Sequence, residues 1–250
     1  MMRTLGFVLM LLIIVSFANI ATAAPLIYTG YNVSFAKEAF ADYTLPANQD
    51  FLLSDVAITR GDTRGIYNAA QEVAFVDNSS PAGTEWAFAN NNPSATLSAS
   101  NWAALTFEDW QTSLGGAGSL GDAILGGRAI LHLLDQDIYL DIEFTDWGVG
   151  SGAGGSFAYD RAEIAPSADF DRDGDVDGQD FLTWQRNFGA TFALQSEGDA
   201  NFDGTVDAND LAAWQDSYGS LLLAVIAVPE PTDLLLTCTA FLGLVLRRRV

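Results

Sequence analysis

Residues 169–189 read DFDRDGDVDGQDFLTWQRNFG, and residues 199–219 read DANFDGTVDANDLAAWQDSYG. The second stretch repeats the first, because its acidic and amide side chains, its glycines, its valine and its tryptophan return at matching places. Such self-similarity marks one structural unit that is built twice. The repeat therefore predicts a small module of its own, which we place at residues 166–220.

Oxygen-bearing side chains occupy positions 1, 3, 5, 9 and 12 of each copy, and glycine occupies position 6. This spacing is typical of a calcium-binding loop, in which position 7 contributes its backbone carbonyl. The glycine permits the sharp bend that brings the other ligands together. We therefore expect two Ca²⁺ ions, one in each loop. The expected ligands are Asp169, Asp171, Asp173, Asp175, Asp177 and Asp180 in the first loop, and Asp199, Asn201, Asp203, Thr205, Asp207 and Asp210 in the second.

The alternative for these loops is a solvated acidic segment without a metal ion. Six carboxylates lie between residues 169 and 180, and they would repel one another strongly in the absence of a cation. A flexible ring of hard oxygens suits Ca²⁺ better than Mg²⁺. Neither loop contains His or Cys, which disfavours transition metals.

A stretch with one apolar face follows each loop, and it predicts short helices over residues 180–188 and 210–218. Pro166-Ser167-Ala168 directly precedes the first loop, so no helix leads into it. A loop with an exit helix, present twice, resembles the dockerin type I module. This resemblance implies a module that folds around calcium and docks onto a cohesin domain.

The recognition pair of that family, a Ser or Thr at loop positions 10 and 11, is absent from this chain. Those positions hold Gly178-Gln179 and Ala208-Asn209. The resemblance thus implies the calcium-dependent fold and leaves the partner open. The alternatives are a cohesin-like protein, another envelope protein, and a role for the module as a rigid spacer.

Both ends of the chain carry export signals. Residues 1–23 are typical of a signal peptide, with Arg3 before an apolar stretch and Ala21-Thr22-Ala23 as the cleavage site. Residues 221–250 form a linker followed by Pro229-Glu230-Pro231, an apolar segment and Arg247-Arg248-Arg249. That order resembles the PEP-CTERM sorting tail. The resemblance implies membrane insertion until an exosortase processes the tail, and delivery to the cell surface or extracellular matrix; a plain membrane anchor is the alternative.

Residues 24–165 are rich in β-branched and aromatic residues, with Gly, Asn and Pro between the runs, which predicts a β-sandwich or jelly roll. One helix is expected between Asn101 and Gly115. The fold class is therefore mainly β, with a small α-helical dockerin-like calcium module. Parts of this domain resemble an uncharacterised module of secreted bacterial proteins, which implies export and a β-rich fold. The expected strands are 27–35, 51–59, 72–77, 84–90, 128–134, 137–147 and 155–164, and the resemblance rests on 58–66, 80–86 and 131–161.

Asp141 and Glu143 share one face of the clearest strand, residues 138–146, while Ile138 and its apolar alternates take the other face. Paired carboxylates are what glycoside hydrolysis needs, and laminarinase-like enzymes have a similar strand with three acids. The first of those three places holds Tyr139, so we assign no catalytic residue. The two acids are a candidate ligand face, and a polar outer surface of the sheet is the plainer interpretation.

Charge and composition exclude several classes of function. The chain has 32 acidic and 11 basic residues, for a net charge of −21, so nucleic acid is excluded as a partner. One Cys and one His exclude a Cys–His catalytic pair, and His132 is expected to have a structural role. We therefore expect an exported, non-enzymatic calcium-binding protein of the cell surface or matrix. The alternative is a protein that binds or hydrolyses a polysaccharide through its β domain.

Overall fold

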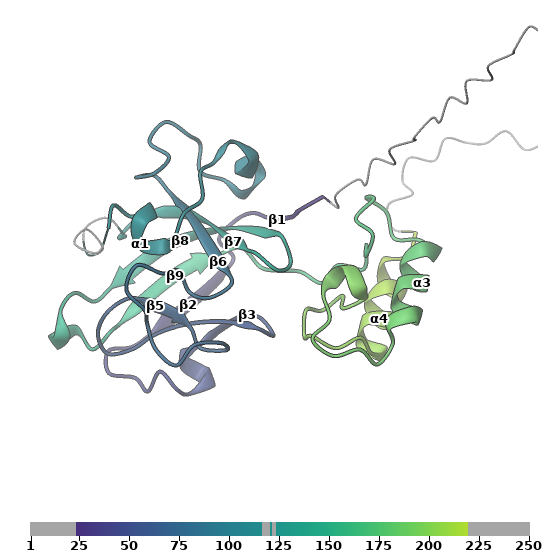
Figure 1. The fold of residues 1–250 in the computed structure, drawn as a ribbon, viewed down its shortest axis with the longest axis horizontal. Helices are drawn as coiled ribbons and strands as arrows, with labels where there is room; N and C mark the ends of the chain where they lie inside the picture. Colours follow the sequence, from purple (N-terminus) through teal and green to yellow (C-terminus); the bar gives the residue numbers. More distant parts are fainter. Residues whose placement is uncertain (1–23, 117–120, 122–123, 220–250) are drawn as a thin grey trace, which may run out of the picture.

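The computed structural model describes residues 24–116, 121 and 124–219. The expected signal peptide and sorting tail lie outside these residues. Figure 1 shows a body of β-sheets beside a smaller helical module that contains α3 and α4. Across the described ranges, no helix is long and apolar enough to cross a membrane.

The fold is mainly β, as expected, with two antiparallel sheets. In the larger sheet the strand order is β2-β9-β8-β7-β6, and β1 joins it by a parallel pairing with β8. The smaller sheet has the order β3-β4-β5. The strands are β1 (Leu26–Tyr28), β2 (Val33–Lys37), β3 (Asp50–Leu53), β4 (Val56–Arg60), β5 (Ile66–Asn68), β6 (Thr84–Phe88), β7 (Arg128–Leu133), β8 (Ile138–Trp147) and β9 (Phe157–Arg161).

One hydrophobic core joins the two sheets. Ile58 and Ile66 of the smaller sheet pack into the same buried cluster as the aromatic and aliphatic residues of the larger sheet. The alternation predicted for the clearest strand is confirmed, because Leu140 and Phe144 of β8 are fully buried in this core. β8 forms a hairpin with the preceding strand β7, with Leu133 opposite Ile138. Tryptophans 86, 110 and 147 belong to the core as well.

A buried ion pair fastens the two sheets together. Arg161 of β9 donates from Nε and Nη2 to the two carboxylate oxygens of Asp50 in β3, at 2.7 and 2.9 Å. The hydroxyl of Tyr159 donates to the same carboxylate at 2.7 Å. Both members of the pair are buried, so each charge depends on the other for compensation.

The second face of the larger sheet is covered rather than exposed. The 3₁₀ segment η2 (Ala99–Ala104) lies on it, and Trp102 stacks on Tyr139 with ring centroids 4.8 Å apart. The prediction of a single helix from Asn101 to Gly115 is wrong, because the segment forms η2 and the short helix α1 (Trp110–Ser113). Backbone hydrogen bonds between Glu108 and Trp86 hold the middle of that segment against the sheet edge, so only α1 is α-helical.

Three of the expected strands need correction. Gly30, with a φ of 102°, divides the stretch 27–35 into β1 and β2. The stretch 51–59 is a hairpin of β3 and β4 that turns between Leu53 and Val56. The stretch 72–77 is irregular, and the third strand of the smaller sheet is β5, which sequence patterning missed because only three residues pair.

Candidate metal centre

The acidic side chains of the first loop lie in two groups of three. Asp169, Asp171 and Asp173 each place a carboxylate oxygen within 4.8 Å of the others. Asp175, Asp177 and Asp180 form a second group by the same measure. The carboxylate of Asp169 accepts hydrogen bonds from the backbone N–H of Asp173 and of Gly174, both at 3.1 Å, which closes the turn.

The second loop reproduces this geometry with different residues. Asp199 accepts from the backbone N–H of Asp203 at 3.2 Å and of Gly204 at 2.8 Å. The amide oxygen of Asn201 takes the place that a carboxylate has in the first loop and accepts from Asp203 at 3.0 Å. Two segments of different composition therefore adopt the same turn geometry.

The residues at positions 9 and 12 also start the helices. Asp177 caps α3 (Gly178–Asn187), and Asp207 caps α4 (Ala208–Ser217). Asp180 and Asp210 complete a capping box in each case, and both are fully buried. A helix N-terminus favours carboxylates, so the same residues stabilise the helices and close the loops.

Each helix braces the opposite loop. The indole N–H of Trp184 in α3 donates to the carbonyl of Asp207 at 2.8 Å, and Trp214 in α4 donates to the carbonyl of Asp177 at 2.8 Å. The two helices begin two residues earlier than expected, which makes Asp177 and Asp207 their caps. The matched distances give the module an approximate twofold symmetry.

The clustered carboxylates are costly without a cation. Burial raises the pKa of Asp199 to about 6. Burial, followed by neighbouring carboxylates, also raises the pKa of Asp169 and of Asp171. The hydroxyl of Thr205 has the opposite effect, since its hydrogen bond lowers the pKa of Asp203.

The donor set fits Ca²⁺. All twelve expected ligand groups are oxygens, and they come from carboxylates, one amide and two backbone carbonyls. The carbonyls expected at position 7 belong to Asp175 and Thr205, and neither accepts a backbone hydrogen bond from a described residue. The structure thus brings the acidic side chains of the first loop together in two groups, which could hold a metal ion.

Position 4 of each loop contacts the β-rich domain, which the sequence analysis did not foresee. Arg172 donates from Nη2 to the carbonyl of Gln136 at 2.8 Å and from Nη1 to that of Ala24 at 3.2 Å. Phe202, at the matching place in the second loop, is 5% exposed and belongs to the main hydrophobic core. An apolar residue in an otherwise polar loop was the available signal.

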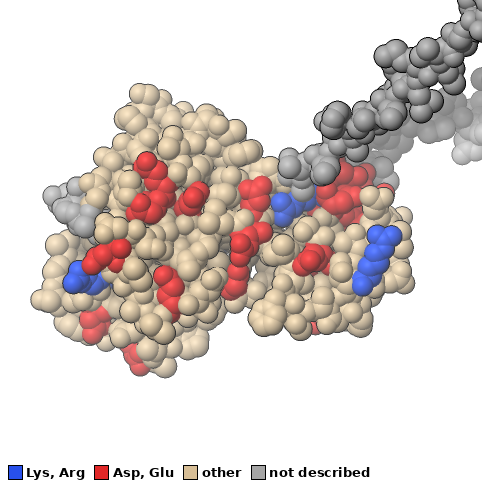
Figure 2. Space-filling view, viewed as in Figure 1, with Lys and Arg blue, Asp and Glu red and all other residues tan. Residues whose placement is uncertain are grey.

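Further contacts close this junction. The backbone N–H of Ser54, in the β3–β4 turn, donates to the carbonyl of Phe202 at 3.2 Å. The fully buried Gln195 donates from its backbone N–H to the side-chain oxygen of Gln136 at 2.9 Å. Figure 2 shows Asp and Glu on the module, along its junction with the β-rich domain and over the β-rich domain itself, while Lys and Arg are sparse on this face.

The two acids of the candidate ligand face on β8 both have partners within the fold. Asp141 is buried and accepts from the backbone N–H of Gly30 at 3.0 Å and of Ala99 at 2.6 Å. Glu143 pairs with Arg128 at 3.1 Å. Both carboxylates are therefore engaged in hydrogen bonds or ion pairs within the fold.

His132 also has partners inside the protein. Its Nε2 lies 3.0 Å from a carboxylate oxygen of Asp137, and its ring stacks on Tyr139 with centroids 4.1 Å apart. This agrees with the structural role expected from the sequence.

Comparison with protein-family models, with curated proteins and with solved structures gave no match. Function is therefore inferred from the chemistry and position of the sites.

Proposed function

We propose that this protein is an exported calcium-binding protein of the cell surface or matrix, without enzymatic activity, whose module at residues 166–220 binds two Ca²⁺ ions. The convergence of two loops of different composition on one ligand arrangement carries this proposal. The bound ions neutralise the clustered carboxylates and so couple metal binding to folding of the module. The export part of the proposal rests on the two terminal signals.

The residues at positions 1 and 12 of each loop have different roles in the proposed site. Asp169 and Asp199 hold the turn and supply position 1, while Asp180 and Asp210 close the loops from the first turn of each helix. A short Asp at position 12 is sufficient because the capping box already fixes its orientation.

The contacts of Arg172 and Phe202 favour the rigid-spacer role for the module. Both side chains leave the calcium loops and enter the β-rich domain, so ordered loops hold the two bodies together. Docking to a cohesin-like or other envelope protein would use the other side of the module. Leu182, Phe188 and Tyr218 are 43%, 60% and 57% exposed there.

Calcium titration of the full chain tests this proposal. Isothermal titration should give two ions per chain, and Asp173→Ala and Asp203→Ala should each remove at least one. The matched control is Asp216→Asn, an exposed acid of α4 that lies outside the loops and should leave the stoichiometry at two. An unchanged stoichiometry in both Asp→Ala variants would show that the loops are not the calcium sites.

A further inference from the structure

Two adjoining hollows lie on the β-rich domain, away from the calcium loops. The first has a volume of about 310 Å³ and the second about 280 Å³. Arg64 and Phe75 line both, so they form a shared wall between two parts of one groove. We call it the Arg64 groove; Gln111 and Asp77 line its first hollow, and Tyr43 and Asp62 its second.

The frame of this groove is rigid. Arg60 is buried and lies over the ring of Trp147 at 3.6 Å, and burial lowers its pKa to about 10. Its Nε donates to the carbonyl of Arg64 at 2.8 Å, and its other nitrogens donate to carbonyls of the β8–β9 connection. This holds the backbone of Arg64 at a φ of 79°, an unusual conformation for a residue with a side chain.

Gly65 completes the frame by letting aromatic rings approach the backbone. A Cβ at this position would lie 2.5 Å from the ring of Phe75 and 2.6 Å from that of Trp110. The close packing therefore fixes Phe75 where it separates the hollows. An aromatic ring held in this way can offer its face or edge without further ordering on binding.

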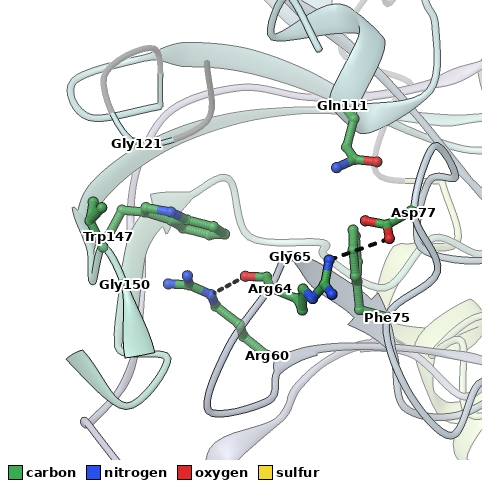
Figure 3. A pocket seen from close by; sticks show the side chains of 10 residues that line it. Arg60, Arg64, Gly65, Phe75, Asp77, Gln111, Gly121, Trp147 and Gly150 are labelled. Carbon is green, nitrogen blue, oxygen red and sulfur yellow. Dashed lines mark hydrogen bonds and ion pairs between the residues drawn. The ribbon is translucent and has the colours of Figure 1, made fainter. Parts of the chain in front are cut away.

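The groove presents polar groups of both kinds. The Arg64 guanidinium and the Asp77 carboxylate are 3.4 Å apart, with side chains 66% and 58% exposed, so both can turn to a ligand. Gln111 is 2% exposed and uses its side-chain oxygen for the backbone N–H of Asn78. Figure 3 shows its amide nitrogen directed into the open space that Trp147, Arg64 and Phe75 surround.

We propose that the Arg64 groove binds an uncharged glycan strand, with one sugar ring in each hollow. Neighbouring hydroxyls of a sugar both donate and accept, which matches paired guanidinium, amide and carboxylate groups. The apolar face of the ring packs on Phe75 and Tyr43. An anionic polysaccharide is disfavoured, because the protein has a net charge of −21 and Asp62 and Asp77 balance the arginines of the groove.

This inference goes beyond the calcium-dependent role, since no residue of the groove belongs to the module. It also places glycan recognition at a different site from Asp141 and Glu143, the acids that the sequence offered.

Titration of the calcium-loaded full chain with cellohexaose, laminarihexaose and maltohexaose tests the proposal. At least one of these neutral chains should bind, and Arg64→Gln should weaken that binding about tenfold or more through loss of charged hydrogen bonds. Phe75→Ala should do the same. The matched control, Phe192→Ala, removes an aromatic ring that is 96% exposed on the module and should leave the affinity unchanged.

Arg64→Gln decides the result, because its exposed side chain can be replaced without loss of the fold, which a thermal melt verifies. Lack of binding to all three chains at millimolar concentration would overturn the proposal. So would equal binding by Arg64→Gln, or binding of oligogalacturonate in place of the neutral chains, since that would define an anion site.

Discussion

Phe202 shows how much depends on a single side chain at position 4 of a proposed calcium loop. Replacement by Ala removes a ring from the main core and should lower the stability of the calcium-loaded chain by about 3 kcal/mol. Thermal unfolding of Phe202→Ala in saturating calcium measures this. Phe192→Ala is the control, because that ring is 96% exposed and its loss should have no effect. Equal melting of both variants would mean that Phe202 does not bind the two bodies together.

The raised pKa of Asp199 makes the metal-free protein sensitive to pH. The ordinary pKa is 3.8 and the folded value is about 6, so the folded state holds its proton more tightly than the unfolded chain. The contribution of Asp199 to the stability of the metal-free module is therefore greatest below about pH 4 and is lost as pH rises through about 6. Thermal melts of metal-stripped protein from pH 4 to 7 should fall in this direction, and added calcium should reverse the trend.

At the level of single residues, the sequence predicts which acidic side chains of the first loop lie close together, but it does not predict the contacts of position 4. The spacing from Asp169 to Asp180 is local, so the chain alone indicates which oxygens converge. The role of Asp141 was beyond prediction. Its two partner amides lie 111 and 42 positions away in sequence, and only the folded sheet and η2 bring them to one carboxylate.

Among the elements, β3 and β9 depend on the ion pair between Asp50 and Arg161. Arg161→Ala would leave the Asp50 carboxylate buried beside Tyr159 without its counter-charge, which should cost about 3–5 kcal/mol. Chemical denaturation measures the loss. Arg128→Ala is the matched control, because its pair with Glu143 is largely exposed and should contribute less than about 1 kcal/mol. Similar losses in both variants would contradict this ranking.

Long and regular elements were easier to predict from the sequence than short ones. From Ile138 to Phe144 the side chains of β8 alternate between the two faces as predicted, and a register shift between Phe144 and Asp146 then places Trp147 in the core. The three residues of β5 offer too short a period to recognise. The apolar residues from Trp102 to Trp110 resemble one helical face, but backbone bonds to Trp86 hold that segment extended at Glu108, so tertiary pairing prevailed over local pattern.

For the whole molecule, we expect calcium to control the joint between the two bodies. The connection from Ala162 to Ala168 should be protected in the loaded protein and cleaved rapidly by proteinase K once calcium is removed, because the ordered loops hold Arg172 and Phe202 in place. The cleavage site is mapped by mass spectrometry. Arg172→Ala should increase cleavage in calcium. Arg186→Ala, which changes a solvent-exposed arginine of α3, is the control. If cleavage of this connection is the same with and without calcium, calcium does not control the contact between the two bodies.

The crossed indole contacts of Trp184 and Trp214 have a consequence for how the module responds to its ion. The indole of each helix donates a hydrogen bond to the loop of the other copy. Binding of an ion in one loop should therefore help to order the second loop and raise its affinity. Singly occupied molecules should therefore be scarce at equilibrium, and the titration curve should be steeper than that of two independent sites. The contact between the module and the β-rich domain would then form over a narrow range of external calcium concentration. The β-rich domain would be held in place only above a threshold concentration of calcium outside the cell.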